Sequence, residues 1–397
     1  MVMRTGREYL AIPGPSVIPE RVLAAMHQGS PDIYAPEIEA LAASLQADLK
    51  RVAGTKHDVA IYIANGHGTW EAALCNIFSP GDHGLFLANR HFGLGWAGMA
   101  ERLGVKAEVM DFGRSGAIDV ARVAEVLKAD TTHQIKAVLA VHVDTASSAK
   151  NDLPALRAAM DAARHPALLA VDCIASLGCD AFRMDAYGVD LMVAACQKGL
   201  MTPPGMGFVF FGPKAAALRE QAKCVTHYWD WKPRAAPQEF CNYWDGTAPT
   251  HHLFGLRAAL DMIFEEGLQA VWARHARLAR AYWAALEAWG QGGPLLMNVA
   301  APVERSHAVT AVSAGPGSEN LRAWLTANTG VTLGIGLGMA PPGDPARDQF
   351  FRIGHMGHVN AQMVLGVIGA VETGLTALQI PHAKGALEAA AGILAGG

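Results

Sequence analysis

Short apolar runs alternate with helical patterns through the first half of the chain. In the helical patterns apolar residues recur every three or four positions, whereas the short runs are almost continuously apolar. Continuous apolar runs are typical of parallel strands covered on both faces, because neither face meets water. The pattern predicts strands at 58–64, 83–88, 136–143, 167–173, 191–195 and 207–211, with helices at 69–78, 92–103 and 153–163. We therefore predict an α/β fold with a mostly parallel sheet.

The second half of the chain has a different pattern. Residues 214–249 are irregular and rich in aromatic residues and proline, which predicts a long functional loop. Residues 250–289 have the period of one or two long helices. Further strands are predicted at 308–313 and 350–354, and a terminal helix within 382–397. We expect a large domain over 20–265 and a smaller α+β C-terminal domain over 266–397 with 1–19.

Composition excludes several classes of protein. The chain has 397 residues, of which 51% are hydrophobic, and a net charge of -4 without a basic stripe, so we expect no nucleic-acid partner. No apolar run reaches the roughly 18 residues that a membrane helix needs. The N-terminus lacks the apolar segment of a secretory signal. Six cysteines without C-x-x-C spacing indicate reduced thiols in a cytoplasmic protein.

The most specific local feature is a lysine just beyond a predicted buried strand. Lys198 follows Cys196 and Gln197 after the strand at 191–195. A buried ammonium group is costly, and a lysine loses that charge when it forms a Schiff base with a carbonyl. A surface lysine in a loop is the alternative, but ligands bind at the carboxyl ends of strands in α/β sheets.

Two charged residues in apolar strands also require partners. Asp172 ends the strand at 167–173, where a carboxylate must be paired or hydrogen-bonded. It would suit a protonated pyridinium nitrogen, or it caps the turn that follows. Arg352 lies in the strand at 350–354, and its planar fork suits either a carboxylate ligand or a structural salt bridge.

A glycine turn and an aromatic residue complete the candidate site. Residues 65–69, with the sequence NGHGT, follow a strand and open a helix, whose backbone amides favour a phosphate. The two glycines are too few for a dinucleotide fingerprint or a P-loop, and a plain strand-to-helix turn fits equally well. Phe92 begins the next helix and either belongs to the core or covers one face of a flat cofactor.

Two other kinds of site are not supported by the residue spacing. The sixteen histidines and six cysteines form no H-E-x-x-H or C-x-x-C pattern, so we expect no metal. The chain has no G-x-S-x-G nucleophile elbow. The candidate chemistry therefore centres on Lys198.

Taken in order, these segments resemble one family. GHGTWEAAL at 66–74, the strand ending in Asp172, QKGLMTPPG at 197–205 and RIGHMG at 352–357 resemble the class V aminotransferases. Within that family the chain is most similar to the serine/alanine–glyoxylate aminotransferase group. The resemblance implies the type I fold of pyridoxal-phosphate (PLP) enzymes, with PLP as cofactor and a homodimer whose active sites lie across its interface.

The resemblance also implies a role for each matching residue. Lys198 is implied to be the Schiff-base lysine and proton shuttle, with Asp172 as partner of the pyridinium nitrogen. Arg352 is implied to bind the substrate carboxylate, and the loop with Tyr34 to lie near the substrate. The other implied cofactor-binding residues are Gly66, His67, Gly68 and Gln197 around the phosphate, Thr247 from the neighbouring subunit, Phe92 and Ile174 on the two ring faces, and Thr145 at the phenolic oxygen.

The implied reaction is transamination by a ping-pong mechanism. An amino acid (serine, alanine or aspartate) would give its amino group to a 2-oxo acid (glyoxylate or pyruvate). Asp144 and Trp244 depart from the group's usual residues, and Asp144-Thr145 resembles the pyridoxamine–pyruvate aminotransferases, which act on the free vitamin B6 amine. Because the phosphate-pocket residues are present, we expect an enzyme that retains PLP, with that activity as the alternative. A PLP lyase or desulfurase would need a mobile cysteine, for which Cys224 is the candidate.

Overall fold

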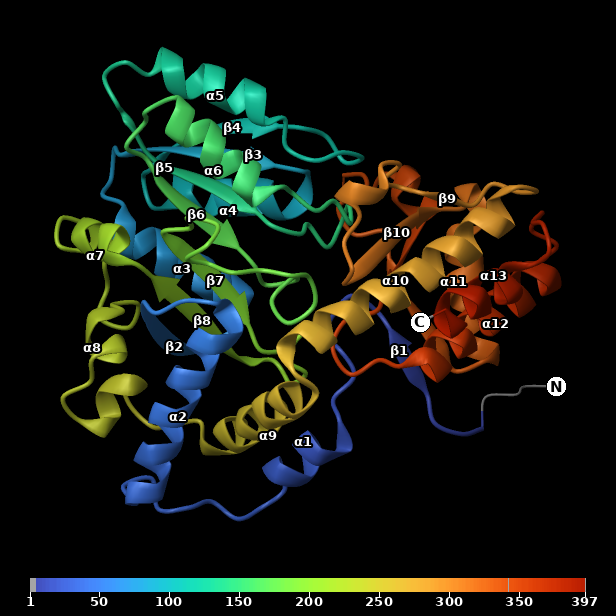
Figure 1. The fold of residues 1–397 in the computed structure, drawn as a ribbon, viewed down its shortest axis with the longest axis horizontal. Coiled ribbons are helices and arrows are strands. Elements are labelled where there is room, and N and C mark those ends of the chain that lie inside the picture. The colour runs from blue at the N-terminus through green and yellow to red at the C-terminus, as the bar shows by residue number, and fades with distance from the viewer. Residues whose placement is uncertain (1–4, 342, 397) are drawn as a thin grey trace.

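The computed structural model describes residues 5–341 and 343–396 and contains two β-sheets (Figure 1). In the larger sheet the strand order is β2-β8-β7-β6-β5-β3-β4. The neighbours from β7 to β4 pair in parallel, and β8 runs antiparallel to both of its neighbours. The strands are β2 (Asp58–Ala64), β3 (His83–Ala88), β4 (Lys106–Asp111), β5 (Ile135–Val141), β6 (Leu168–Asp172), β7 (Leu191–Ala195) and β8 (Gly205–Phe211). The predicted α/β class with a mostly parallel sheet is confirmed.

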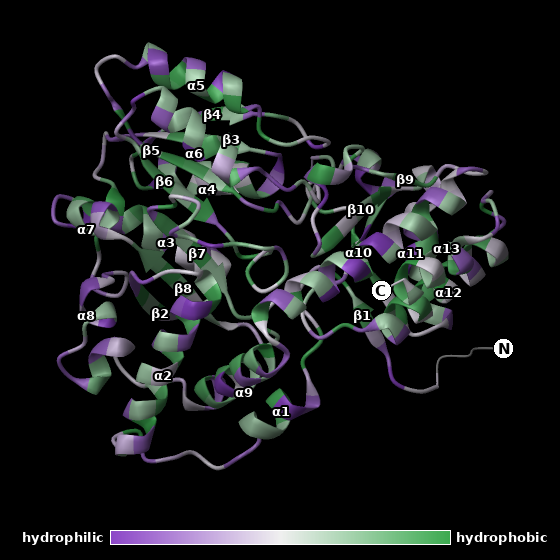
Figure 2. Ribbon diagram, in the orientation of Figure 1, coloured by the Kyte–Doolittle hydropathy of each residue, from purple (hydrophilic) through white to green (hydrophobic). Residues whose placement is uncertain are grey.

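Helices cover both faces of this sheet, and two apolar clusters fill the space beneath them. One cluster includes residues of α2 and α9, and the other is built largely around α3 and α4 with their tryptophans. In Figure 2 the strands are mostly green, the hydrophobic end of the scale. The helices that accompany the sheet are α1 (Glu20–Met26), α2 (Pro36–Ala53), α3 (Gly66–Ile77), α4 (His91–Arg102), α5 (Val120–Ala129), α6 (Leu153–Ala162), α7 (Pro213–Arg219), α8 (Lys232–Ala235) and α9 (Thr250–Glu266).

The second sheet has five strands in the order β1-β11-β12-β10-β9. A separate apolar cluster joins it to the C-terminal helices. Its strands are β1 (Tyr9–Ala11), β9 (Leu296–Met297), β10 (Val309–Ser313), β11 (Val331–Ile335) and β12 (Phe350–Gly354), and its helices are α10 (Leu268–Gly290), α11 (Ser318–Asn328), α12 (Ala361–Ala377) and α13 (Ala386–Ala395). The division into 20–265 and 266–397 with 1–19 stays a prediction, and residues 1–4 and 397 lie outside the described part of the chain.

The segment predicted as a long loop contains short helices and is firmly anchored. Besides α7 and α8 it holds a 3-10 helix, Phe240–Tyr243. Arg234 is fully buried and donates hydrogen bonds to the carbonyls of Ile61, Tyr228 and Tyr243. Trp244 is buried in the same apolar cluster as α9. The loop is therefore packed against the sheet, although only short stretches of it are helical.

The cysteines follow the sequence prediction for the most part. All six are free, four are buried, and Cys241 is exposed. Cys224 lies outside the cavity described below, and its thiol donates to the carbonyl of Leu103. Among the described helices, none is long and apolar enough to cross a membrane.

Candidate active site

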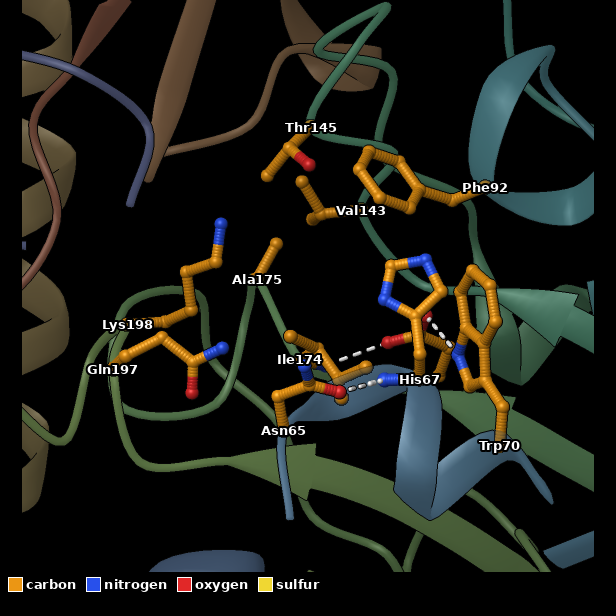
Figure 3. A pocket seen from close by; sticks show the side chains of 12 residues that line it. Asn65, His67, Trp70, Phe92, Val143, Thr145, Ile174, Ala175, Gln197 and Lys198 are labelled. Atoms are coloured by element: carbon orange, nitrogen blue, oxygen red, sulfur yellow. Dashed lines mark hydrogen bonds between the residues drawn. The ribbon is translucent and has the colours of Figure 1, made fainter. Parts of the chain in front are cut away.

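A cavity lies where four strands of the large sheet end (Figure 3). The cavity is bounded by segments that directly follow β2, β5, β6 and β7, as expected for the carboxyl edge of an α/β sheet. The residues that line it are Asn65, Gly66, His67, Trp70, Phe92, Val143, Thr145, Asp172, Ile174, Ala175, Gln197 and Lys198.

Lys198 projects into this cavity from the turn after β7. Its Nζ donates a hydrogen bond to the carbonyl of Pro13, and its own carbonyl accepts one from Ser16 Oγ at 2.7 Å. Burial and the nearby charge of Arg352 lower the pKa of Lys198 to about 8. A larger fraction of its amine is therefore neutral near physiological pH than for an exposed lysine, as a nucleophile or base requires.

The depressed pKa predicts a pH-dependent gain in stability when Lys198 is replaced by methionine. Because the folded pKa of about 8 lies below the ordinary 10.5, the buried charge destabilises the cofactor-free protein fully below pH 8. That penalty disappears as the pH rises from 8 to 10.5. We expect Lys198→Met to raise the free energy of unfolding by about 1–3 kcal/mol at pH 7 and by much less at pH 10, as measured by urea unfolding of the cofactor-free protein. Lys214→Met, which also removes a lysine bound to a backbone carbonyl, is the control. An equal gain at both pH values would contradict the prediction.

Asp172 ends β6 with its carboxylate buried at the wall of the cavity. Its Oδ1 accepts a hydrogen bond from the backbone N–H of Ile174 at 2.7 Å, and its Oδ2 accepts one from the indole N–H of Trp70 at 2.8 Å. Burial raises the pKa of Asp172 to about 7, although both hydrogen bonds act to lower it. The free carboxylate is thus poorly stabilised, and a ligand with a positive N–H group would stabilise it.

The N-terminus of α3 forms another wall of the cavity. Asn65 caps the helix, and its Oδ1 accepts from the backbone N–H groups of His67 and Gly68 at 3.0 and 3.3 Å. An anion that bound to these two amides would displace the Asn65 side chain. A Cβ added at Gly66 would lie 2.5 Å from Ile174 Cδ1, so the Ile174 side chain would have to move away from the helix start.

Aromatic rings line the side of the cavity opposite Lys198 and Gln197 (Figure 3). Phe92 meets Trp70 edge-on with ring centroids 6.1 Å apart, and His67 lies 4.6 Å from Trp70. The backbone N–H of Phe92 donates to Asp144 Oδ2 at 3.0 Å, so the loop after β5 fixes the start of α4. A flat, partly apolar ligand fits between these rings and the lysine side.

Arg352 connects the second sheet to this cavity. It lies on β12 and is 5% exposed. Its Nη1 donates to the carbonyl of Thr145 and its Nε to the carbonyl of Ile335, both at 2.7 Å. Burial lowers the pKa of Arg352 to about 10, and the charge of Asp144 opposes that shift. The guanidinium is therefore held by neutral carbonyls and remains available to an anion.

The structure brings most of the predicted site residues to one place. Eight of them line the cavity: Gly66, His67, Phe92, Thr145, Asp172, Ile174, Gln197 and Lys198. Gly68 and Arg352 adjoin it through Asn65 and Thr145. Tyr34 is 79% exposed, Thr247 is also exposed, and neither is among the residues lining this cavity. The role proposed for Thr247 involves a second subunit, and the substrate role of Tyr34 stays a prediction.

Comparisons with known proteins agree with this geometry. The family description "Aminotransferase class-V" matches residues 8–342. The chain belongs to the class-V aminotransferase family.

Individual relatives cover nearly the whole chain. The serine–glyoxylate aminotransferase of Arabidopsis thaliana is 39% identical, over 97% of this chain and 94% of its own. The L-aspartate–glyoxylate aminotransferase of Paracoccus denitrificans is 35% identical, over 98% and 96%. The pyridoxamine–pyruvate aminotransferase structure from Mesorhizobium loti superposes with a TM-score of 0.88 at 25% identity, over 99% of both chains. This class-V aminotransferase is thus a PLP-dependent transaminase with the type I fold.

The residues of the cavity fit PLP. Asp172 offers a buried acid to a ring nitrogen, and the aromatic side offers a surface to a flat ring. At the end near α3, the side-chain oxygen of Gln197 is buried without a hydrogen-bond partner among the described residues. An unpaired buried polar atom indicates a missing partner. Because this oxygen and the oxygens of a phosphate are both acceptors, a phosphate at this end would be bound through a bridging water or by the amide N–H group of a turned Gln197 side chain.

Four of the residues that line the cavity were not assigned a role from the sequence: Asn65, Trp70, Val143 and Ala175. Asn65 was part of the predicted turn, but its cap could be recognised only from the helix start that the structure defines. Trp70 appeared to be an ordinary apolar position of α3. Its spacing of four residues from Gly66 places both on one face of the helix, which is a signal that could have identified it.

Proposed function

We propose that this transaminase transfers the amino group of a small amino acid (serine, alanine or aspartate) to glyoxylate or pyruvate in two half-reactions. The observation that carries the proposal is the arrangement of Lys198, Asp172 and the α3 N-terminus around one cavity, with Arg352 beside it. Glyoxylate is the acceptor in the names of the relatives at 39% and 35% identity, which supports the choice of acceptor.

Each residue then has one task. PLP, when bound, supplies a carbonyl that takes up the amino group and a ring that withdraws electrons from the substrate Cα. Lys198 Nζ takes the proton from that Cα, for which a pKa of about 8 is well matched. Asp172 holds a positive charge at the ring nitrogen, and Arg352 holds the substrate carboxylate. Phe92 and Ile174 limit access of water to the ring.

The proposal includes a homodimer in a cytoplasmic setting. Thr247 is exposed and outside the cavity, which supports the idea that it completes the site of a partner subunit. Six free cysteines, four of them buried, support a reducing compartment. No part of this arrangement requires a second cofactor.

A half-reaction experiment tests the proposed function. We expect the PLP-loaded protein, mixed with serine, alanine or aspartate without an acceptor, to release about one equivalent of 2-oxo acid per subunit, as a ping-pong enzyme does. Glyoxylate added afterwards should be converted to glycine. Failure to release oxo acid from any of the three amino acids would contradict the proposal.

A second candidate is the pyridoxamine–pyruvate reaction. It is favoured by the structural match at a TM-score of 0.88 and by Asp144-Thr145. It predicts release of free pyridoxal from pyridoxamine in the presence of pyruvate. Because residues 66, 67 and 197 bound the end of the cavity assigned to the phosphate, we expect this activity to be minor compared with transamination of amino acids.

A further inference from the structure

The carboxylate of Asp172 is held by two donors of different origin. The backbone N–H of Ile174 lies two residues away, so this bond is formed within the local turn. The indole N–H of Trp70 comes from α3, which precedes Asp172 by about one hundred residues, and it meets Oδ2 at 2.8 Å (Figure 3). The indole therefore fixes the carboxylate from outside its own strand.

The indole of Trp70 has little freedom to move. Trp70 is 1% exposed, and its ring stacks on Trp96 with centroids 5.9 Å apart and an interplanar angle of 17°. Phe92 and His67 contact the same ring from other directions. Such packing fixes the direction of the N–H group, because rotation of the indole would displace three neighbouring rings.

The indole bond matters because the environment opposes a charged Asp172. Burial raises the pKa of this acid, and the charge of Asp144 acts in the same direction. The N–H groups of Ile174 and Trp70 and the charge of Lys198 act against them. A hydrogen bond to a charged group contributes more than one between neutral groups, so loss of the indole N–H favours the protonated acid.

We propose that Trp70 is a positioning residue that keeps the Asp172 carboxylate ionised and directed at the cofactor's ring nitrogen. The inference rests on the role of Asp172 in the proposed function. A protonated or rotated Asp172 cannot pair with a positive ring nitrogen, so Trp70 acts on the cofactor through Asp172. Packing of the indole alone would give no dependence on the ring nitrogen.

The test compares PLP with its carbocyclic analogue, in which C–H replaces the ring nitrogen. We expect Trp70→Phe to weaken PLP binding to the full-length, cofactor-free protein by roughly 10- to 100-fold, with little change in affinity for the analogue. Calorimetric titration of both compounds gives the ratio of their dissociation constants. Trp96→Phe is the matched control, because its buried indole N–H has no partner among the described residues, and it should leave the ratio unchanged.

A second variant distinguishes the effect of the indole N–H group from the effect of the ring's shape. Replacing Trp70 by benzothienylalanine, with sulfur in place of the indole N–H, should reproduce the loss seen in Trp70→Phe. An equal loss of affinity for PLP and the analogue would overturn the inference, because it would indicate packing alone. An unchanged ratio in Asp172→Asn would instead reject the proposed role of Asp172. A changed ratio in Asp172→Asn with none in Trp70→Phe would reject only the role of Trp70.

Discussion

Replacing Lys198 by alanine is expected to lower kcat for transamination by roughly 10³-fold or more. Among the described residues that line the cavity, Lys198 carries the one primary amine, so its loss removes both the covalent anchor and the base at the substrate Cα. We also expect borohydride treatment followed by peptide mass spectrometry to attach PLP to residue 198 of the natural protein and not to the variant.

The control for this prediction is Lys214→Ala. Lys214 Nζ donates to the carbonyl of Ala167 at 2.7 Å but does not line the cavity, so activity should be retained. Added methylamine should restore part of the activity of Lys198→Ala by replacing the missing base. Retention of more than about a tenth of the natural kcat by Lys198→Ala would show that another group supplies the base.

The elements that were predicted best are the ones with unbroken apolar sequence. β2, β3 and β7 begin and end at the predicted residues because both faces of these strands are largely covered. β4 was not predicted: it is an edge strand with several exposed residues, so its sequence KAEVMD shows no apolar run. The α helix Pro36–Ala53 was also missed, although its buried face contains regularly spaced apolar residues.

The site was predicted where the chemistry of one residue was sufficient. Lys198 and Asp172 could be selected because a charged side chain at the end of an apolar strand needs a partner. The hydrogen bond from Trp70 to Asp172 could not be predicted, because it joins positions about one hundred residues apart and an indole in a helix usually belongs to the core. The role of Thr247 depends on a second chain, and no property of a single subunit tests it.

The hydrogen bonds of Asp144 could not be predicted from the sequence. In the sequence this residue departs from the group's usual residue, and Asp144-Thr145 resembles the pyridoxamine–pyruvate aminotransferases. In the structure its carboxylate accepts from the backbone N–H groups of Phe92, Ala146 and Ser147. The Asp144 side chain therefore orders the loop that carries Thr145 and fixes it to the start of α4.

The second large effect is expected at Arg352. Its bonds to Thr145 and Ile335 use two of the five N–H groups of a guanidinium, which leaves three for a substrate carboxylate. We expect Arg352→Gln to lower kcat/KM for serine by roughly 10²- to 10³-fold, as for loss of one member of a buried charge pair. Arg352→Lys should be intermediate, because an ammonium keeps the charge without the planar fork.

Ethanolamine, which is serine without its carboxylate, distinguishes loss of carboxylate binding from a structural disturbance of the site. If Arg352 binds the carboxylate, the preference for serine over ethanolamine should nearly vanish in Arg352→Gln, while PLP affinity stays unchanged. Arg305→Gln, which removes an arginine that also holds two backbone carbonyls, should keep the preference. An Arg352→Gln variant that loses activity on both amines equally would show that Arg352 only supports the loop at Thr145. The substrate carboxylate would then have to be bound elsewhere.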